Sequence, residues 1–332
     1  MKRALIYFYA LALIAAALLA LSVGAAHLDH LWSVLFHPAS LQYGAERDIL
    51  WQIRIPRILT ALCVGSALGA AGVMAQGAGN NPLAEPAILG TSAGASLGVL
   101  VGLLTNIETI GSLNAMACGL VGGLAASLFT FSAGRSRSGQ SSVALIIVGI
   151  ATSATISAIV GLTTSLVTRA DARSVSFWTW GSLALTTGKD LWVLAPVSLL
   201  GIAMAWMVAP NLDLLSLGDQ SAQHIGADPI RTRRSALVIL ALLVAAGVST
   251  VGTIAFLGLA APHIARLGFG PRHRPLVLHS ATIGALILLL ADTAARTLAA
   301  PRELPIGLIT ALIGAPILVI LVRRNLEVWR QP

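Results

Sequence analysis

The side chains in this sequence that could do chemistry are a few charged and histidine residues that border long apolar runs. The chain has no GxxxxGK(S/T) phosphate-binding loop, no HExxH motif and no nucleophile placed beside a base. Its glycines lie inside apolar runs rather than between a strand and a helix. The sequence therefore argues against a membrane enzyme. Any energy for work against a gradient has to come from another protein or from ions, and the absence of a series of acids within the apolar runs makes ion coupling the weaker idea.

Four charged residues border or enter apolar runs in a way that points to a partner. Asp292 lies inside one run, where a charge is costly, and Arg296 follows four residues later on the same helical face. The two either form a local pair or leave Arg296 presented to another molecule. Arg54 and Arg57 flank a proline at the start of a second run. They either anchor that run at the membrane interface or, with Arg296, form a positive patch for an acidic external protein.

The histidines and cysteines do not make a metal site. His27, His30 and His37 share one polar segment, and a metal or haem iron is the ligand that such residues would take. Their spacing is loose, and no cysteine or carboxylate cluster accompanies them. Cys63 and Cys118 lie in apolar runs and are expected to be small buried hydrophobic residues. The sequence therefore predicts no metal centre.

A structured polar interruption covers residues 211–234. Its markers are a leucine cluster, a glycine, a capping aspartate, a stop glycine and an Asp-Pro pair: Leu212, Leu214, Leu215, Leu217, Gly218, Asp219, Gly226, Asp228 and Pro229. An aspartate at the start and a glycine at the end are typical helix boundaries, and proline favours the first helical position. The pattern predicts two capped short helices, the second over 220–225, backed by arginines. We interpret the stretch as a docking platform between membrane spans.

The amino-acid composition indicates which secondary-structure elements hold these charged and histidine side chains in place. The chain has 332 residues, of which 56% are hydrophobic and only 10% are charged, far below the roughly 25% charged residues of a soluble domain. The net charge of +8 comes without a basic face with interleaved aromatics, which argues against a nucleic-acid partner. We predict an all-α, multi-pass membrane protein with about ten spans. The expected spans are 4–24, 56–77, 88–104, 112–132, 143–166, 191–208, 230–250, 254–267 (broken by Pro262), 276–297 and 304–322.

Charge placement orients the spans. Most basic residues then fall on the inner side, as the positive-inside rule expects, and most acids fall outside. Both termini and the stretch 211–234 are therefore predicted to be cytoplasmic, and 25–52 and 168–190 to be external. An apolar run after Arg57 that ends in LAEP is echoed after Arg234 by one that ends in LAAP, in the opposite direction. This weak echo favours inverted-repeat-like halves, as in some transporters.

Small residues recur every four positions in two spans. In the third they predict a packing seam, because small residues let helix backbones approach closely: Gly90, Gly94, Gly98 and Gly102. In the fifth they predict either a seam or the wall of a water-filled path: Gly149, Ser153, Ser157, Gly161 and Ser165. A second polar set in the fifth span suits such a wall: Thr152, Thr155, Thr163 and Thr164.

Several long motifs resemble one family of membrane proteins. They are RIPRILTALCVGSALGAAGVMAQG (54–77), NNPLAEPAILGTSAGASLG (80–98), FWTWGSLA (177–184), NLDLLSLGDQSAQHIGAD (211–228), GTIAFLGLAAPHIARLGFGPRHR (252–274), ADTAART (291–297) and ELPIGLITALIGAPILVILV (303–322). Together they resemble the membrane subunits of ATP-driven importers for iron-siderophores, haem and vitamin B12, the type II ABC importers. The resemblance covers nearly all of residues 1–332, which we expect to be one permease domain.

The resemblance implies partners. It implies a homodimeric core with a central path, two cytoplasmic ATPase subunits that hold ATP and magnesium, and an external substrate-binding protein. It implies no cofactor on this chain and a location in the inner, cytoplasmic membrane. Alternating access would follow from ATP-driven motion of the ATPase subunits. The expected cargo is a bulky iron chelate, with haem next and a corrinoid third. An alternative is an ion-coupled carrier or channel without an ATPase.

The resemblance also implies site residues. The coupling loop 211–228 would contact the ATPase through Leu212, Leu214, Leu215, Leu217, Gly218, Asp219, Gln220, Ala222, His224, Ile225 and Gly226. The contacts to the binding protein would be Arg54, Arg57 and Arg296. The gate and translocation path would involve Asn81, Leu83, Ser141, Ser142, Thr152 and Thr155. Arg169 and Arg173 are either external loop charges or contacts for carboxylates of a chelate or of haem.

Overall fold

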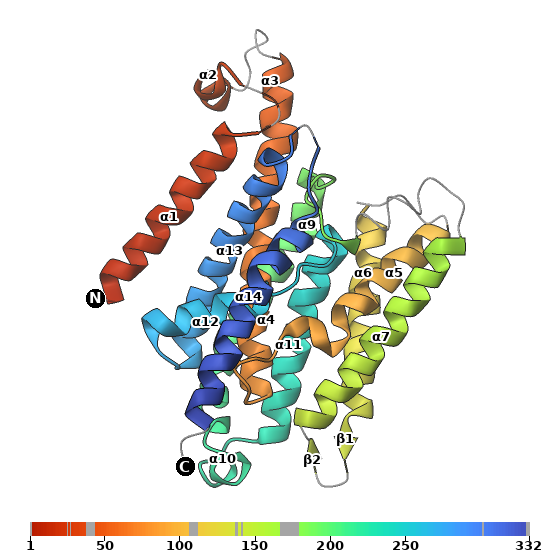
Figure 1. The fold of residues 1–332 in the computed structure, drawn as a ribbon, viewed down its shortest axis with the longest axis vertical. Helices are drawn as coiled ribbons and strands as arrows, with labels where there is room; N and C mark the ends of the chain where they lie inside the picture. Colours follow the sequence, from red (N-terminus) through yellow and green to blue (C-terminus); the bar gives the residue numbers. More distant parts are fainter. Residues whose placement is uncertain are drawn as a thin grey trace.

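The protein is a bundle of long helices with short irregular connections (Figure 1). The computed structural model describes residues 2–24, 26, 28–37, 44–105, 112–136, 139–140, 142–166, 179–300 and 302–329. Within these residues, ten helices have 13 residues or more, in keeping with the prediction of about ten membrane helices. They are α1 (Lys2–Ser22), α4 (Ile55–Ala78), α5 (Thr91–Leu104), α6 (Leu113–Ala133), α7 (Ser142–Leu166), α9 (Gly188–Leu215), α11 (Pro229–Val251), α12 (Leu257–Phe269), α13 (His273–Thr297) and α14 (Ile306–Trp329).

Short elements connect or extend these helices. They are α2 (Leu31–Phe36), α3 (Gly44–Asp48), the π-helical η2 (Ile49–Arg54), the 3-10 helix η3 (Pro86–Leu89), α10 (Asp219–His224) and the two-residue strands β1 (Arg135–Ser136) and β2 (Gly139–Gln140). The strands pair antiparallel, with Arg135 opposite Gln140. Because α3 and η2 run directly into α4, the helix that holds the second span begins at Gly44, earlier than predicted. Seven of the described helices are long and apolar enough to cross a membrane.

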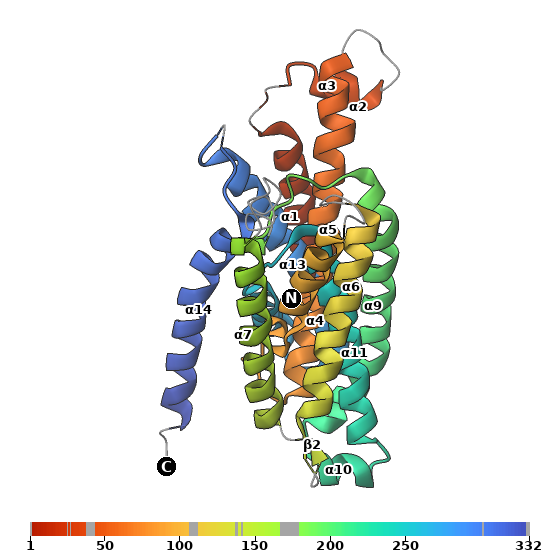
Figure 2. The same cartoon turned by 90° about the vertical axis from the view of Figure 1, so that its right-hand side faces the viewer.

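Helix α4 forms the centre of the bundle and packs against α9, α11, α12 and α13. Glycines let the backbones meet: a Cβ built on Gly65 would lie 2.5 Å from the carbonyl oxygen of Gly284, and one on Gly72 would lie 1.9 Å from that of Gly258. Association in a lipid environment depends on such close packing, because lipid supplies no hydrophobic force between helices. Figure 2 shows α14 at one side of the bundle and α9 at the opposite side.

Two sequence expectations about helix ends were wrong. Helix α9 continues to Leu215, so the leucine cluster is its last turn rather than a separate short helix. Helix α12 runs unbroken through Pro262. Proline lacks the N–H that would bond to the carbonyl of Gly258, and the side-chain amide of Gln76 instead donates to that oxygen at 3.5 Å. A side chain from α4 thus replaces the missing intrahelical bond.

The faces made of small residues in the third and fifth spans, now α5 and α7, differ in what they pack against. In α5, Cβ atoms at Gly94 and Gly98 would lie 2.4 to 2.1 Å from α6, which confirms the predicted seam. In α7, a Cβ at Gly161 would meet nothing within 4 Å. The α7 face is therefore open along at least part of its length within this chain.

Candidate functional site

The short helix α10 projects from the end of the molecule opposite α2 and α3 (Figures 1 and 2). A glycine with positive φ lies on each side of it, Gly218 at 96° and Gly226 at 94°. Gly226 donates its N–H to Gln223, and Ala227 donates to Ala222, which is the hydrogen-bond pattern of a Schellman motif. Glycine tolerates these φ values at little cost, so the break before α10 and the stop after it are both read correctly from the sequence.

An arginine ties α10 to the core. Arg233 of α11 donates Nη1 and Nη2 to the two carboxylate oxygens of Asp219, at 2.7 and 2.8 Å. Its Nε donates to the carbonyl oxygen of Ala78, the last residue of α4, at 3.2 Å. The prediction that Asp219 caps the short helix is therefore wrong: it is the first helical residue, and its carboxylate binds Arg233 rather than a backbone N–H.

A second contact fixes the end of α9. The Asp213 carboxylate accepts from the backbone N–H of His273 at 2.9 Å and lies 2.7 Å from Nδ1 of the same residue, the first of α13. Asp228 caps α11 as predicted, since its side chain accepts from the N–H groups of Ile230 and Arg231 at 3.0 Å each. The α10 region is thus anchored to α4, α9, α11 and α13, so a force on it reaches four long helices.

The expected coupling residues divide into a buried and an exposed set. Leu212, Leu215 and Ala222 are buried and hold the platform to the bundle. Leu217 and Ile225 are each 59% exposed, on either side of α10. Two large apolar side chains that project from a braced helix are suited to insertion into a partner groove. The remaining expected coupling residues are half-buried or exposed: Leu214, Gly218, Asp219, Gln220, His224 and Gly226.

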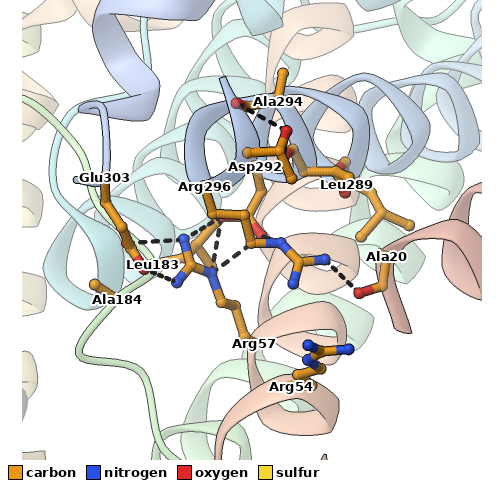
Figure 3. Close-up of polar contacts among 12 residues, drawn as sticks. Ala20, Arg54, Arg57, Leu183, Ala184, Leu289, Asp292, Ala294, Arg296 and Glu303 are labelled. Atoms are coloured by element: carbon orange, nitrogen blue, oxygen red, sulfur yellow. Dashed lines mark hydrogen bonds and ion pairs between the residues drawn. The ribbon is translucent and has the colours of Figure 1, made fainter. Parts of the chain in front are cut away.

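The three expected binding-protein arginines lie close together near the α2 end, as Figure 3 shows. Arg57 lies between two carboxylates, with contacts of 2.8 to 3.1 Å to Asp292 and of 2.8 and 3.1 Å to Glu303. The expected Asp292–Arg296 pair exists at 3.8 Å, but Arg57 is the closer partner of that carboxylate. Arg57 therefore links α4 to both ends of the α13–α14 connection.

Arg54 and Arg296 meet backbone oxygens instead. Arg54 donates to the carbonyls of Leu21 and Ala26. Arg296 donates to the carbonyl of Ala20, as Figure 3 shows. All three arginines are at most 6% exposed. The structure brings together the residues expected to contact a binding protein, but the end of α1 covers two of them.

Two of the expected gate residues, Asn81 and Leu83, line a small cavity. Asn81 accepts from the N–H of Leu83 at 2.9 Å, which shapes the loop after α4. Both residues line a cavity of about 170 Å³ together with Leu145 and Ile146 of α7. The loop therefore faces the start of α7, as the gate prediction requires. Helix α7 begins at Ser142, whereas Ser141 lies outside the described residues, as do Arg169 and Arg173.

Two hollows border α7, and each is lined by different polar residues of this helix. Thr152 and Thr155 line an apolar groove of about 970 Å³ that is shared with α5 and α6. A cavity of about 460 Å³ is lined by hydroxyl side chains, among them Ser92 and Ser96 of α5 and Ser157 of α7. The face predicted as either seam or wall contributes Ser153, Ser157 and Gly161 to this cavity, and Thr164 of the threonine set lines it as well.

Sequence reasoning missed two acidic residues. Glu85 accepts at 2.9 Å from the backbone N–H of Phe256, the residue that precedes α12 and that has a φ of 64°. Glu303 is the second, because its pairing with Arg57 at 2.8 Å was not predicted. The available signal for Glu85 was an acid beside a proline in an otherwise uncharged loop. Among the described residues, no group of three His, Cys, Asp or Glu side chains could hold a metal ion.

Comparison with known proteins gives consistent matches. A family model described as the FecCD transport family matches residues 11–324. The chain is 35% identical to the hemin transport system permease protein of Yersinia pestis, over 85% of each chain. It is 34% identical to the iron(3+)-hydroxamate import system permease protein of Bacillus subtilis, over 84% of this chain and 72% of that protein. A metal-chelate type ABC transporter solved in an inward-facing conformation superposes with a TM-score of 0.84, at 29% identity, over 97% of this chain and 99% of that one.

Proposed function

The chain belongs to the FecCD transport family, and from this premise we propose that it is the permease subunit of an importer driven by ATP hydrolysis on partner chains. Two copies would form the core, two ATPase subunits would bind at α10, and a substrate-binding protein would deliver cargo at the α2 end. This chain would bind no cofactor, because ATP and magnesium belong to the ATPase. It would lie in the inner membrane with both termini on the cytoplasmic side.

The observation that carries the proposal is the braced helix α10. Its exposed apolar residues, Leu217 and Ile225, offer a contact surface, and Arg233 and Asp213 transmit a push to the bundle. Such a push favours rigid-body motion of helices, because packed cores shift between discrete arrangements rather than deform continuously. Alternating access by movement of the helices around α7 and α14 is the mechanism that this arrangement supports.

The apolar surface of α7 and α14 supports a second copy as partner. Large exposed side chains line these helices, among them Ile147, Leu162, Leu312 and Ile313. The hydroxyl-lined cavity beside α7 would then border a path between the two copies. The cargo we propose is a bulky iron chelate, a siderophore complex or haem, in keeping with the names of the two relatives. A corrinoid is the alternative cargo.

The test is nucleotide-dependent uptake into proteoliposomes, compared for ferric siderophores, haem and cobalamin. We expect Leu217→Glu and Ile225→Glu to abolish copurification of the ATPase subunit and uptake, because a charge cannot be buried unpaired in an apolar contact. Gln223→Glu places the same charge on an exposed residue of α10 and is the matched control. Uptake without nucleotide and without an ATPase would instead establish the ion-coupled carrier.

A further inference from the structure

The C-terminal end of α1 holds two arginines that come from other helices. Arg54 donates Nη1 to the carbonyl oxygen of Leu21 and Nη2 to that of Ala26. Arg296 donates Nη2 to the carbonyl oxygen of Ala20, as Figure 3 shows. Both guanidinium groups are almost fully buried in this arrangement.

These contacts have a clear physical cause. The last four carbonyl groups of a helix lack intrahelical partners, and a cation near them is favoured by the helix dipole. Helix α1 has no basic residue in its own last turn. Arg54 and Arg296 supply that cap from the end of η2 and from α13, so α1 and the two arginines satisfy one another.

Helix α1 buries little of its surface against the bundle, although Tyr9, Ala17 and Leu21 pack partly buried against the core. Among its residues from Ala4 onward, only Ala16 and Ala20 are buried, and most of its large apolar side chains face outward. Figure 1 shows the helix at the edge of the molecule. An element with few buried apolar contacts opens at a low free-energy cost, so the arginine contacts contribute a large share of what holds its end in place.

The three arginines differ in how completely the chain satisfies them. Arg57 makes hydrogen bonds from Nε and both Nη atoms to Asp292 and Glu303. Arg296 has a buried Nε without a hydrogen-bond partner among the described residues, and its ion pair with Asp292 is 3.8 Å long. A buried donor without a partner is costly, and a carboxylate is the acceptor that a guanidinium binds best. Arg296 can therefore accept an additional carboxylate partner, whereas Arg57 already uses Nε and both Nη atoms.

We propose that the end of α1 is a removable cover over the docking site: acidic side chains of the substrate-binding protein displace the carbonyls of residues 20, 21 and 26 from Arg54 and Arg296. Arg57 stays bound to Asp292 and Glu303 throughout and acts as a structural link. Docking then exchanges neutral acceptors for charged ones and releases the end of α1. This inference rests on the proposed function, since it requires an external binding protein.

Gly24 provides a direct test, because it lies directly against the covered arginines. A Cβ built there would lie 3.0 Å from Nη1 of Arg296 and 3.0 Å from Nη2 of Arg54. Gly24→Val should push the cover off and raise the affinity of the cognate binding protein for the transporter in nanodiscs. We expect roughly a tenfold gain, since the cover reduces the fraction of molecules that are competent to bind. Gly188→Val is the control, because a Cβ there would meet nothing within 4 Å.

A second measurement does not depend on that variant. In a background without Cys63 and Cys118, Ala20→Cys places a thiol at a fully buried position of α1. A membrane-impermeant maleimide should label it slowly in the free transporter, and faster once the binding protein docks or when Gly24→Val is added. Trp32→Cys, at an exposed position on α2, should label at the same rate in the free transporter with and without Gly24→Val.

The possible outcomes distinguish a failure of the α1 cover from a failure of the proposed importer function. Unchanged affinity of Gly24→Val, or labelling of Ala20→Cys that stays slow with the binding protein bound, would overturn the cover. If no external protein docks on the wild-type transporter, the proposed function fails and the docking role falls with it. Labelling of Ala20→Cys accelerated by Gly24→Val alone would then report only that the contact is structural.

Discussion

At the scale of single residues, three arginines in one cluster have different surroundings and therefore different roles. Arg57 is neutralised by two carboxylates inside the chain, and Asp292 is fully buried. Arg54 and Arg296 hold helix-end carbonyls, which are weaker acceptors than carboxylates. A guanidinium group with neutral partners gains interaction free energy when it exchanges them for a carboxylate. Arg57 would instead lose interaction free energy, because it would have to give up carboxylates that it already binds.

The Arg57 link predicts a specific order of stabilities. Arg57→Ala should destabilise the protein by about 3–5 kcal/mol, because it leaves Asp292 buried with only a distant ion pair. Asp292→Ala should cost less, because Arg57 keeps Glu303 at 2.8 Å. Thermal unfolding of the purified variants measures both, and the double variant should be less destabilised than the sum of the two. Equal effects of the single variants would contradict this account.

At the scale of elements, α10 is a short helix that depends on its neighbours. Six residues cannot form a stable helix alone, so its position derives from the flanking glycines and from Arg233. The ion pair with Asp219 and the bond to the end of α4 make the platform and the central helix move together.

Two arginines two residues apart on α11 allow this coupling to be tested. Arg233→Ala removes the pair with Asp219 and the bond to Ala78, and should reduce ATPase copurification and nucleotide-dependent uptake several-fold. Arg231→Ala removes only an exposed pair with Asp228, and such surface pairs contribute little. Its activity should match the wild type. Equal loss in both variants would indicate a general need for positive charge instead.

At the scale of the whole molecule, the bundle is organised around α4, whose glycines let α12 and α13 approach its backbone. Most of α4 is buried, whereas most of α1 is exposed. The architecture thus combines a tightly packed centre with a peripheral helix, and only the latter is free to move without disrupting the core.

The contrast between a tightly packed centre and open peripheral positions predicts where the added methyl group of a Gly→Ala substitution is tolerated. Gly72→Ala places a Cβ 1.9 Å from the carbonyl oxygen of Gly258, a backbone atom that cannot move aside cheaply. We expect the folded yield to fall severely, as judged by size-exclusion chromatography in detergent. Gly188→Ala, with open space around its Cβ, should give the wild-type yield. A normal yield of Gly72→Ala would show that α4 and α12 lie farther apart.

The sequence alone determined the features that depend on local chemistry. Apolar run lengths predicted the long helices. Gly218 and Gly226 predicted the breaks on either side of α10, and Asp228 predicted the cap of α11, because these signals act within a few residues of themselves. The hydroxyl-lined cavity was predicted only as one of two alternatives, since a run of small residues serves packing and polar walls equally well.

Only the tertiary structure decided which groups pair. Arg57 meets Asp292 across 235 residues, and Arg296 meets Ala20 across 276. The sequence pointed to the near neighbour, Asp292 for Arg296, because spacing on one helix is all that a single chain reveals. The capping of α1 by distant arginines and the hydrogen bond of Glu85 to the residue before α12 depend on how helices pack, so no local pattern could have predicted either contact.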